Sequence, residues 1–298
     1  MIDIIIINYN STDHLINCLR SIKNSLDSFH ADIFVQDNAS VDGVERALVE
    51  FPHIKLTRNS QNIGFAAAVN QALVQGNNPY VVLLNPDTFV LDDFFRVSLE
   101  FMKNHPRTGI MGPKVLEQDG KLQNSARSFP TILTAFFGRT SFLSRLFPKN
   151  PITMKNLPSL NSDGCSPMEV DWVSGACMVV NRKAIEVTGF LDDRFFLYWE
   201  DADWCRRMWQ SGWKVIYYPK ASIRHFTGVS SQKELFRSVV EFHKSAYRLF
   251  EKYERSLVSL LKPLILSGLL VRAGIVLTSQ SARKVCQTSI KASANDKG

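Results

Sequence analysis

The sequence predicts an α/β fold in which a doubly wound sheet carries flanking helices and is followed by amphipathic C-terminal helices. Short apolar runs rich in β-branched residues alternate with segments of helical periodicity through the N-terminal third of the chain, which is the rhythm of a doubly wound sheet. Polar and acidic residues directly follow several of these runs. Ligands of such sheets bind beyond the carboxyl ends of the strands, so these residues are candidates for a binding crevice.

The first elements follow this rhythm closely. Ile2–Ile7 is continuously apolar, as a strand buried on both faces requires, and the apolar positions of Thr12–Leu26 fall on one helical face. Further strands are predicted at Asp32–Gln36, Ile54–Thr57 and Tyr80–Leu84, and helices at Val41–Phe51 and from Asn62 to about Gln75.

The pattern becomes less regular after residue 110. Phe129–Pro158 is apolar and basic without clear periodicity, which fits either a mobile loop facing substrate or membrane, or a short helical excursion packed on the core. Other elements are predicted as a hairpin of Gly112–Leu116 and Leu122–Ser125, strands at Cys177–Asn181, Trp213–Tyr217 and Ala221–His225, and a helix from about Asp201 to Ser211.

The excess positive charge lies entirely in the tail. Residues 1–232 carry 23 Lys and Arg and 23 Asp and Glu, whereas residues 233–298 carry 12 and 5. Gln232–Tyr253 has helical apolar spacing with a basic opposite face, and Leu257–Leu277 is strongly apolar but contains Lys262 and Arg272, which a membrane-spanning helix would disfavour. We expect interfacial helices on an anionic membrane surface; a C-terminal helix packed on the domain is the alternative.

Cysteine usage and the N-terminus indicate a cytoplasmic protein. The five cysteines are scattered without CxxC or Cys/His metal spacing, as expected in a reducing compartment. The apolar run at Ile4–Ile7 is too short for a signal peptide and has no basic residues before it.

The glycine pattern excludes several common α/β enzymes. Asn8–Leu19, which follows the first strand, contains no glycine, so the GxGxxG turn of dinucleotide-binding proteins is absent. The sequence also lacks the GxxxxGK[ST] loop of P-loop proteins and the GxSxG elbow of α/β-hydrolases.

Three strand ends carry candidate ligand-binding residues. Asp37 could accept a hydrogen bond from the N3–H of uracil or thymine, or could stabilise an Asx-type turn. Asp87, after Asn85 and Pro86, suits Mg²⁺ or Mn²⁺ held together with a diphosphate. His225 could supply a nitrogen ligand, although a lone histidine is more often structural.

A dense stretch of acids and aromatic residues begins at Phe195. Glu200, Asp201 and Asp203 fall in the first turn of the predicted helix, where the helix dipole favours negative charge. Taken alone, this stretch is better explained by helix capping than by a functional role of the acids.

In order and spacing, six motifs resemble the family 2 glycosyltransferases, especially their bacterial rhamnosyltransferase-like branch. They cover roughly Met1 to Gly228 and read IIIINYNS, VQDNASVDG, NIGFAAAVNQAL, LLNPDT, DWVSGACMVV and GFLDDRFFLYWEDADWCRRMWQSGWKVIYYPKASIRH. The resemblance implies a GT-A fold with a mixed sheet and inverting transfer from a nucleotide-diphosphate sugar.

Site roles then follow from the matching positions. Asp201 would be the catalytic base, Asp37 would bind the nucleobase, and Asp87 with His225 would hold Mg²⁺ or Mn²⁺. The family often has DxD where this chain has Asn85-Pro86-Asp87, and loss of the first carboxylate should weaken metal affinity. The remaining positions expected to contact substrate or nucleotide are Asn8, Asn38, Asn62, Gly64, Asn85, Trp172, Gly175 and Glu200.

The resemblance also sets expectations for domains and partners. Residues 1–230 would form the glycosyltransferase domain, with a nucleotide-sugar half at 1–108 and an acceptor and catalytic half at 109–230, and residues 231–298 a basic helical region on the inner face of the cell membrane. The expected partners are a dTDP- or UDP-sugar donor and a lipid-linked saccharide acceptor. The resemblance alone suggests dTDP-rhamnose as the donor.

Two other functions compete with this expectation. A catalytically inactive, membrane-associated scaffold would share the fold and the tail, but would have no reason to retain Asp37, Asp87, Asp201 and His225 together. Nucleic-acid binding rests on the basic tail alone and is not expected.

Overall fold

The computed structural model describes residues 1–26, 29–130, 156–226, 235–254 and 260–295. The chain divides into two compact units. The first comprises Met1–Arg194 and Glu200–Ser230, and the second comprises Phe195–Trp199 and Ser231–Gly298. Each unit is described by itself.

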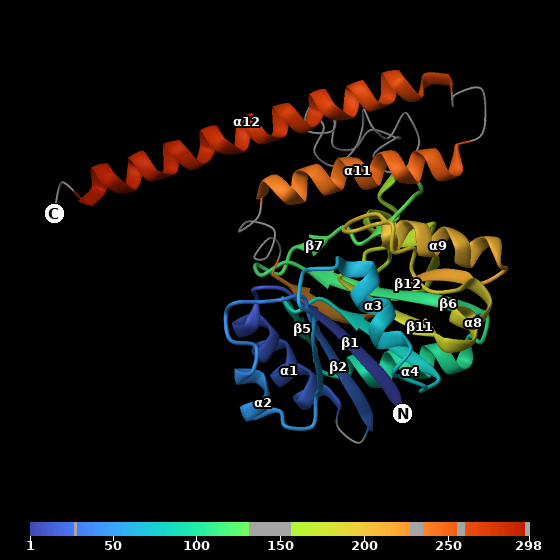
Figure 1. The fold of residues 1–298 in the computed structure, drawn as a ribbon. Helices are drawn as coiled ribbons and strands as arrows, with labels where there is room; N and C mark the ends of the chain where they lie inside the picture. The colour runs from blue at the N-terminus through green and yellow to red at the C-terminus, as the bar shows by residue number, and fades with distance from the viewer. Residues whose placement is uncertain (27–28, 131–155, 227–234, 255–259, 296–298) are drawn as a thin grey trace. The chain divides into compact units, whose positions relative to one another are not determined.

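A mixed sheet forms the centre of the first unit (Figure 1). In spatial order its main strands are β3 (Lys55–Arg58), β2 (Ala31–Asp37), β1 (Ile2–Asn8), β4 (Tyr80–Leu84), β11 (Cys177–Asn181), β6 (Thr108–Leu116), β12 (Lys214–His225) and β5 (Thr88–Val90). The first four are parallel, β11 is antiparallel to both β4 and β6, and β12 is parallel to β6. The prediction of a mixed sheet is confirmed.

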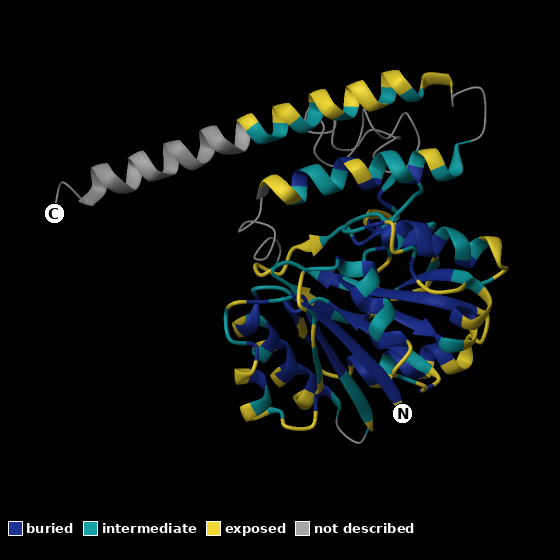
Figure 2. Ribbon diagram, in the orientation of Figure 1, coloured by how far each residue is buried: buried dark blue, intermediate teal, exposed yellow. Residues whose placement is uncertain are grey.

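Helices cover both faces of this sheet. One face packs against α1 (Thr12–Leu26), α2 (Arg46–Glu50) and α4 (Phe94–Asn104), and the other against α3 (Phe65–Leu73), α8 (Arg182–Thr188) and α9 (Glu200–Gln210). Figure 2 shows the central strands as the most buried part of this unit. The doubly wound arrangement with flanking helices is therefore confirmed.

Strand β1 shows how the apolar pattern produces this core. All seven of its residues are buried, and Ile2, Ile4 and Ile6 join the cluster that also contains Leu15 and Leu19 of α1. Side chains alternate between the faces of a strand, so Asp3 points to the opposite side. There its carboxylate accepts hydrogen bonds from the backbone and side chain of Asn78, and it pairs with Arg182 at 2.7 Å.

Both edges of the main strand order are short. β3 has four residues and carries Lys55 and Arg58 at its ends, and β5 has three residues, paired to β12 alone within the sheet.

Short strands complete the first unit. β7 (Leu122–Gln123) pairs with β6 in the predicted hairpin, and the backbone N–H of Glu117 donates to Lys121 across the turn. The other short elements are β8 (Ala126–Arg127), which pairs with β10 (Trp172–Val173), β9 (Met168–Glu169), which pairs with β12, and the 3₁₀ turn η1 (Pro158–Asn161). Most of the predicted loop at Phe129–Pro158 lies outside the described residues.

The structure corrects the prediction of two strands at Trp213–Tyr217 and Ala221–His225. Lys214–His225 is a single strand, and its pairing with β6 shifts between Tyr218 and Ser222. Pro219 cannot donate to the ladder, but the chain stays extended as a bulge and pairing resumes beyond it.

The predicted helix at Val41–Phe51 is also shorter in the structure. Only Arg46–Glu50 is helical, because Gly43 has a φ of +76° and the carboxylate of Asp42 accepts hydrogen bonds from the N–H and hydroxyl of Thr12 at the start of α1. β5 and α4, which follow Asp87, were not predicted.

The second unit contains α11 (Leu235–Tyr253), α12 (Lys262–Asn295) and the segment Phe195–Trp199. α11 and α12 lie side by side (Figure 1). α12 begins at Lys262 with Pro263 in its first turn, where a proline is tolerated, and continues well beyond the predicted end at Leu277. In the described part of the chain, no helix combines the length and apolar character that a membrane-spanning segment needs.

Candidate active site

A hydrogen-bonded turn lies at the carboxyl ends of β1 and β2. The side-chain N–H of Asn8 donates to Asp37 at 2.8 Å and to the hydroxyl of Ser40 at 3.1 Å, and the Ser40 backbone N–H donates to Asp37 at 3.0 Å. Arg58 lies 3.6 Å from the same carboxylate. The structure thus contains the Asx-type turn that was the alternative for Asp37, whose exposed fraction is 0%. A nucleobase could reach this carboxylate only if the turn shifts.

A second set of side-chain amides lies next to this turn, at the same end of the strands. Asn38 donates from its side chain to the carbonyl of Gly64 at 3.1 Å and accepts from Asn59 at 2.9 Å. Asn62 accepts from the Gly64 N–H at 3.0 Å, and Gly64 has a φ of +91°, which a residue with a side chain rarely adopts. The sequence places these residues on separate loops, and the fold brings them together at the start of α3.

Asp87 and His225 meet at the end of β4. Nε2 of His225 lies 3.2 Å from Oδ1 of Asp87 and 3.4 Å from Nδ2 of Asn85, and its other ring nitrogen lies 3.0 Å from Oε1 of Gln123. The antiparallel pairing of β5 with β12, in which His225 lies opposite Thr88, explains why residues so far apart in sequence meet here.

The donor atoms of this pair suit a divalent cation. One carboxylate and one imidazole converge, and Oε1 of Gln123 lies within hydrogen-bond distance of the other ring nitrogen, as partners that orient metal-binding histidines commonly do. Among the residues that the structure describes, no group of three or more His, Cys, Asp or Glu side chains is placed to bind a metal. These residues therefore fit a metal that takes its other ligands from substrate oxygens and water.

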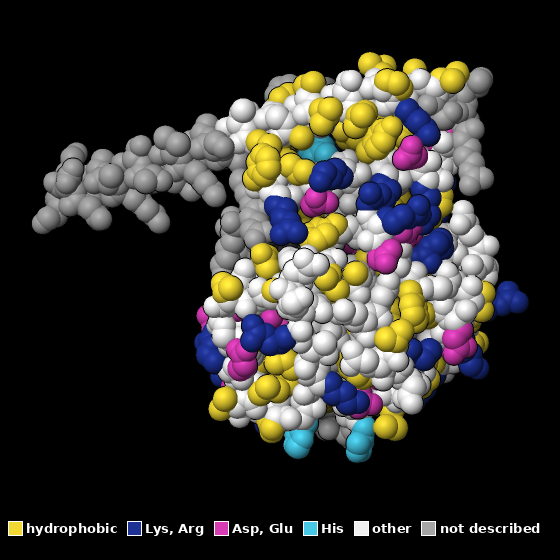
Figure 3. Space-filling view, viewed as in Figure 1, with side chains coloured by type: hydrophobic (Ala, Val, Ile, Leu, Met, Phe, Trp, Pro, Cys, Tyr) yellow, Lys and Arg dark blue, Asp and Glu magenta, His cyan; other side chains and the backbone are white. Residues whose placement is uncertain are grey.

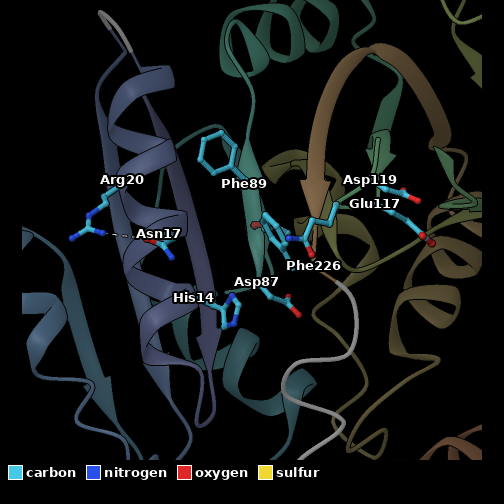
Figure 4. Close-up of a pocket in the computed structure, with 10 residues that line it drawn as sticks. His14, Asn17, Arg20, Asp87, Phe89, Glu117, Asp119 and Phe226 are labelled. Atoms are coloured by element: carbon cyan, nitrogen blue, oxygen red, sulfur yellow. Dashed lines mark hydrogen bonds between the residues drawn. The ribbon is translucent and has the colours of Figure 1, made fainter. Parts of the chain in front are cut away.

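A pocket of about 650 Å³ opens beside Asp87 (Figure 4). Its lining side chains come from α1, from β5 and the residue before it, from the turn around Asp119 and from the residue that follows β12. They include the rings of His14, Phe89 and Phe226 and the carboxylates of Glu117 and Asp119.

Asp201 is held at the start of α9 by backbone donors. Its Oδ2 accepts from the Gly175 N–H at 2.9 Å, and its Oδ1 accepts from the Ala202 N–H at 2.8 Å. Burial raises the pKa of this carboxyl, while the two N–H donors and the positive charge of Arg127 oppose that shift. A carboxylate that is fixed in place and has a raised proton affinity has the properties of a general base.

Glu200 is buried beside it in a different environment. Burial raises the pKa of Glu200 well above its ordinary value, and the negative charge of Asp201 raises it further. Oε2 of Glu200 has no hydrogen-bond partner among the described residues, whereas both oxygens of Asp201 accept N–H donors. The negative charge of the pair is therefore expected on Asp201, with Glu200 protonated.

Asp203 has a structural role. It is fully buried and pairs with Arg207 one turn later at 2.9 Å, and Arg207 also donates to the carbonyls of Thr188 and Phe190. This ion pair fixes α9 against the chain that follows α8.

The backbone immediately before Glu200 is strained. Tyr198 and Trp199 have φ values of +68° and +70°, a conformation that bulky residues rarely adopt. Such residues cost on the order of 1–3 kcal/mol each, and they persist where the surrounding structure holds them in place, often at functional sites.

Trp172 lies on the short sheet close to Asp201. Its ring N–H donates to the carbonyl of Ser128 at 2.9 Å, and the guanidinium of Arg127 lies over its ring at 5.0 Å. Arg127 therefore links Trp172 to the charge on Asp201.

The predicted site residues form three groups that share one edge of the sheet. The first contains Asn8 and Asp37, the second Asp87 and His225, and the third Asp201. β1 pairs directly with β4, and the N–H of Asn85 donates to the carbonyl of Ala176 at 3.0 Å, adjacent to the residue that holds Asp201.

Sequence reasoning missed four residues of this edge. Ser40 and Arg58 contact Asp37, Gln123 contacts His225, and Arg127 stabilises the charge on Asp201. Ser40 lies in a quoted motif and could have been identified, whereas the others lie outside the motifs and are recognisable only once the fold places them.

Comparison with known proteins agrees with this arrangement. The sequence profile described as "Glycosyl transferase family 2" matches residues 3–186. The N-acetylglucosaminyl-diphospho-decaprenol L-rhamnosyltransferase of Mycobacterium tuberculosis is 28% identical over 261 residues, which are 83% of each chain. Rhamnosyltransferase WbbL of Escherichia coli is 24% identical over 83% of this chain and 92% of its own.

Solved structures show the same fold at low identity. A mannosyltransferase from Pyrobaculum calidifontis, solved with GDP-Man and Mn²⁺, superimposes with a TM-score of 0.57 at 14% identity over 95% of this chain and 80% of its own. GalNAc-T7, solved with UDP, GalNAc and Mn²⁺, gives a TM-score of 0.59 at 14% identity; the match covers 84% of this chain but only 47% of that protein.

Proposed function

The chain belongs to family 2 of the glycosyltransferases and has their GT-A fold, and on this basis we propose that it is an inverting enzyme with Asp201 as its general base. The observation that carries the proposal is the position of Asp201. Its carboxylate is fixed by two backbone N–H groups beside the buried Glu200, whose pKa is raised by burial, at the edge of the sheet that also holds Asp87.

In the proposed reaction, Asp201 accepts the proton of an acceptor hydroxyl as the oxygen attacks the anomeric carbon of the donor. The bond from that carbon to the diphosphate breaks, and the diphosphate leaves with the electron pair. Attack on the face opposite the leaving group inverts the configuration. General-base catalysis typically contributes about 10²–10⁴-fold to such a rate.

Asp87 and His225 are proposed to hold Mg²⁺ or Mn²⁺ together with the diphosphate. When bound, the cation neutralises negative charge on the leaving group. Gln123 orients the imidazole through its other nitrogen, and Asn85 lies beside the same ring. The two structural relatives solved with Mn²⁺ support this proposal.

The donor nucleotide is proposed to lie along the first two groups of site residues. Asp37 and Asn38 would recognise the base after the turn that buries the Asp37 carboxylate has shifted, and Asn8, Asn62 and Gly64 would line the same edge. Trp172 and Gly175 fall near the base Asp201, where the acceptor is expected.

The two rhamnosyltransferase relatives favour L-rhamnose from a dTDP-sugar as the transferred group. The mycobacterial relative is named for a diphospho-decaprenol substrate, which favours a lipid-linked saccharide acceptor. A UDP-sugar is the alternative donor.

The C-terminal helices are proposed to rest on the anionic membrane where such an acceptor resides. Seven large apolar residues between Leu260 and Ile275 are exposed, and Figure 3 shows hydrophobic side chains gathered over the described part of α12. Contact with a leaflet would remove this surface from water, and the net positive tail would add electrostatic attraction. The enzyme is then expected on the inner face of the cell membrane.

The Asp201→Asn variant tests the proposed function. With dTDP-rhamnose and N-acetylglucosaminyl-diphospho-polyprenol as probes, we expect kcat to fall by at least about 10²-fold, because an amide cannot accept the proton. Binding of dTDP, measured by titration calorimetry, should be unchanged.

Asp193→Asn is the matched control, since Asp193 is an exposed acid close in sequence. Near-normal turnover by Asp201→Asn would remove this residue from the base role. A wild-type protein that binds nucleotide but transfers no sugar from any nucleotide-sugar donor would favour the scaffold function.

A further inference from the structure

The five residues before Glu200 pack with the C-terminal helices. Phe195–Trp199 belongs to the same compact unit as α11 and α12, although it interrupts the sequence of the first unit. The peptide bond between Trp199 and Glu200 joins this segment directly to the start of α9. Whatever fixes Phe195–Trp199 therefore also restrains the residues at the start of α9.

Two residues of α11 hold this segment. The buried hydroxyl of Ser245 donates to the carbonyl of Leu197 at 3.0 Å. The ring of Phe242 meets Tyr198 edge-on with centroids 5.7 Å apart and lies 5.4 Å from the ring of Trp199. Both aromatic contacts fall on the two residues with positive φ.

Other side chains add to this packing. The guanidinium of Arg237 lies 4.5 Å from the ring centroid of Phe196, and that of Arg272, from α12, lies 6.0 Å from the ring of Phe242. The segment is thus contacted along most of its length by α11, and α12 reaches the ring that holds it.

The strained backbone explains why these contacts matter. Two consecutive bulky residues at positive φ relax to ordinary conformations unless their surroundings oppose it. A change at Tyr198 and Trp199 would alter the backbone that leads into α9, whose second residue, Asp201, accepts from the Gly175 N–H. Displacement of a reacting group by about 1 Å can cost about 10²-fold in rate.

We infer that Phe242 and Ser245 of α11 are positioning residues for the reaction, acting through Tyr198 and Trp199 on Asp201. The inference rests on the proposed function, since it takes Asp201 as the base. It makes the C-terminal helical region part of the catalytic apparatus as well as a membrane contact.

Steady-state kinetics test the functional half of the inference. With the same donor and acceptor probes, Phe242→Ala should lower kcat by about 10- to 100-fold while KM for the donor and binding of dTDP stay within about twofold. Ser245→Ala should lower kcat by about fivefold, the effect of one hydrogen bond. Phe242→Leu, which keeps apolar volume, should recover part of the rate.

The matched control is Phe236→Ala. Phe236 lies on the same helix with 68% of its surface exposed, and its loss should change kcat by less than about twofold. An equal loss in this variant would show that any damage to α11 has the same effect, and would overturn the inference.

Hydrogen exchange tests the structural half without any activity. Peptides covering residues 195–202 should exchange at least about tenfold faster in Phe242→Ala than in the wild type, whereas peptides covering β4 should be unchanged. If Phe242→Ala does not fold, the same comparison is made with Phe242→Leu and Ser245→Ala.

Kinetics and hydrogen exchange together distinguish a failure of the inference from a failure of the proposed function. An inactive wild type, or an active Asp201→Asn variant, overturns the role of Asp201 while the exchange result still decides whether α11 holds the segment. If Asp201→Asn is inactive but folded Phe242→Ala keeps normal kcat and exchange, the inference alone is wrong. Equal losses of kcat and dTDP binding would also overturn it.

Discussion

Two adjacent carboxyl groups at the start of α9 differ in what surrounds each of them. Asp201 accepts backbone N–H donors on both oxygens, whereas Glu200 is enclosed, with no partner on Oε2 among the described residues. Burial raises the pKa of Glu200 well above its ordinary value, which favours the negative charge of the pair on Asp201. The proposed base is the ionised form of Asp201, so kcat should rise with pH through the raised pKa of this carboxyl.

The Glu200→Gln variant should change how stability depends on pH. Because the pKa of Glu200 is raised on folding, the folded protein binds this proton more tightly than the unfolded chain. Its stabilising contribution is fully present below the ordinary pKa of 4.5 and is lost as pH rises toward the raised value. From pH 5 to pH 8, the free energy of unfolding measured with denaturant should therefore decrease more for the wild type than for Glu200→Gln, by about 1 kcal/mol or more.

Asp203→Asn is not a suitable control, because it breaks the buried pair with Arg207; Glu186→Gln, an exposed change on α8, is the matched comparison. Equal pH slopes for the wild type and Glu200→Gln would show that Glu200 is ionised in the folded protein.

Asp87→Ala should reduce activity that depends on a divalent cation. In the proposed site, loss of the carboxylate would leave His225 as the one remaining protein ligand, and we expect kcat/KM in saturating Mn²⁺ to fall by about 10²-fold or more. The measurement is a Mn²⁺ and Mg²⁺ titration of transfer. The exposed neighbour Asp92→Ala should behave as the wild type. Full wild-type activity in excess chelator would remove the metal from the proposed site.

Sequence patterns predicted the elements that carry strong periodicity or continuous apolar runs. The strands at Ile2–Ile7 and Tyr80–Leu84 and the helix Thr12–Leu26 were predicted closely, because burial on both faces or on one helical face leaves a clear signal. The prediction of two strands at Trp213–Tyr217 and Ala221–His225 was wrong, because a bulge accommodates Pro219 and keeps Lys214–His225 as one strand.

The candidate site was less predictable than the fold. Acids at strand ends were visible in sequence, but the contact of His225 with Asp87 depends on an antiparallel edge strand of three residues that has little pattern of its own. The contact of Phe242 in α11 with Tyr198 could not be predicted from the local sequence, because backbone strain and long-range packing appear only in the folded structure.

Arg182→Ala should strongly destabilise the first unit. Arg182 begins α8 and reaches the fully buried Asp3 of β1, so its loss leaves Asp3 with only the N–H donors of Asn78. Removing one partner of a buried pair typically costs about 3–5 kcal/mol. Chemical denaturation should show this loss. Arg96→Ala, which breaks only exposed pairs, should cost less than about 1 kcal/mol, and equal costs would contradict the assignment.

At the scale of the whole molecule, net charge separates the two units. Residues 1–232 carry no net charge, whereas the tail holds the whole excess and the exposed apolar residues of α12. A chain built this way can bind a membrane through one region while the rest remains free of nonspecific attraction to anionic surfaces.

Vesicle sedimentation should detect this binding. The wild type should sediment with vesicles containing anionic phospholipid, and the combined Leu264→Ser, Val271→Ser and Ile275→Ser variant should lose binding by about tenfold or more, since each exposed side chain contributes through apolar burial. Val49→Ser, at an exposed apolar site of the first unit, is the control. Salt-sensitive binding to DNA with no binding to vesicles would instead indicate a nucleic-acid partner.

The short edges of the large sheet bear on how the protein behaves at high concentration. One edge strand, β3, has four residues with Lys55 and Arg58 at its ends, and the other, β5, has three. They give another molecule little backbone on which to add a strand. Exposed sheet edges are the usual template for fibrils, and short charged edges are a known protection. Aggregation of this enzyme is therefore expected to start from its apolar helices, and mild detergent rather than altered strand sequence should keep it dispersed.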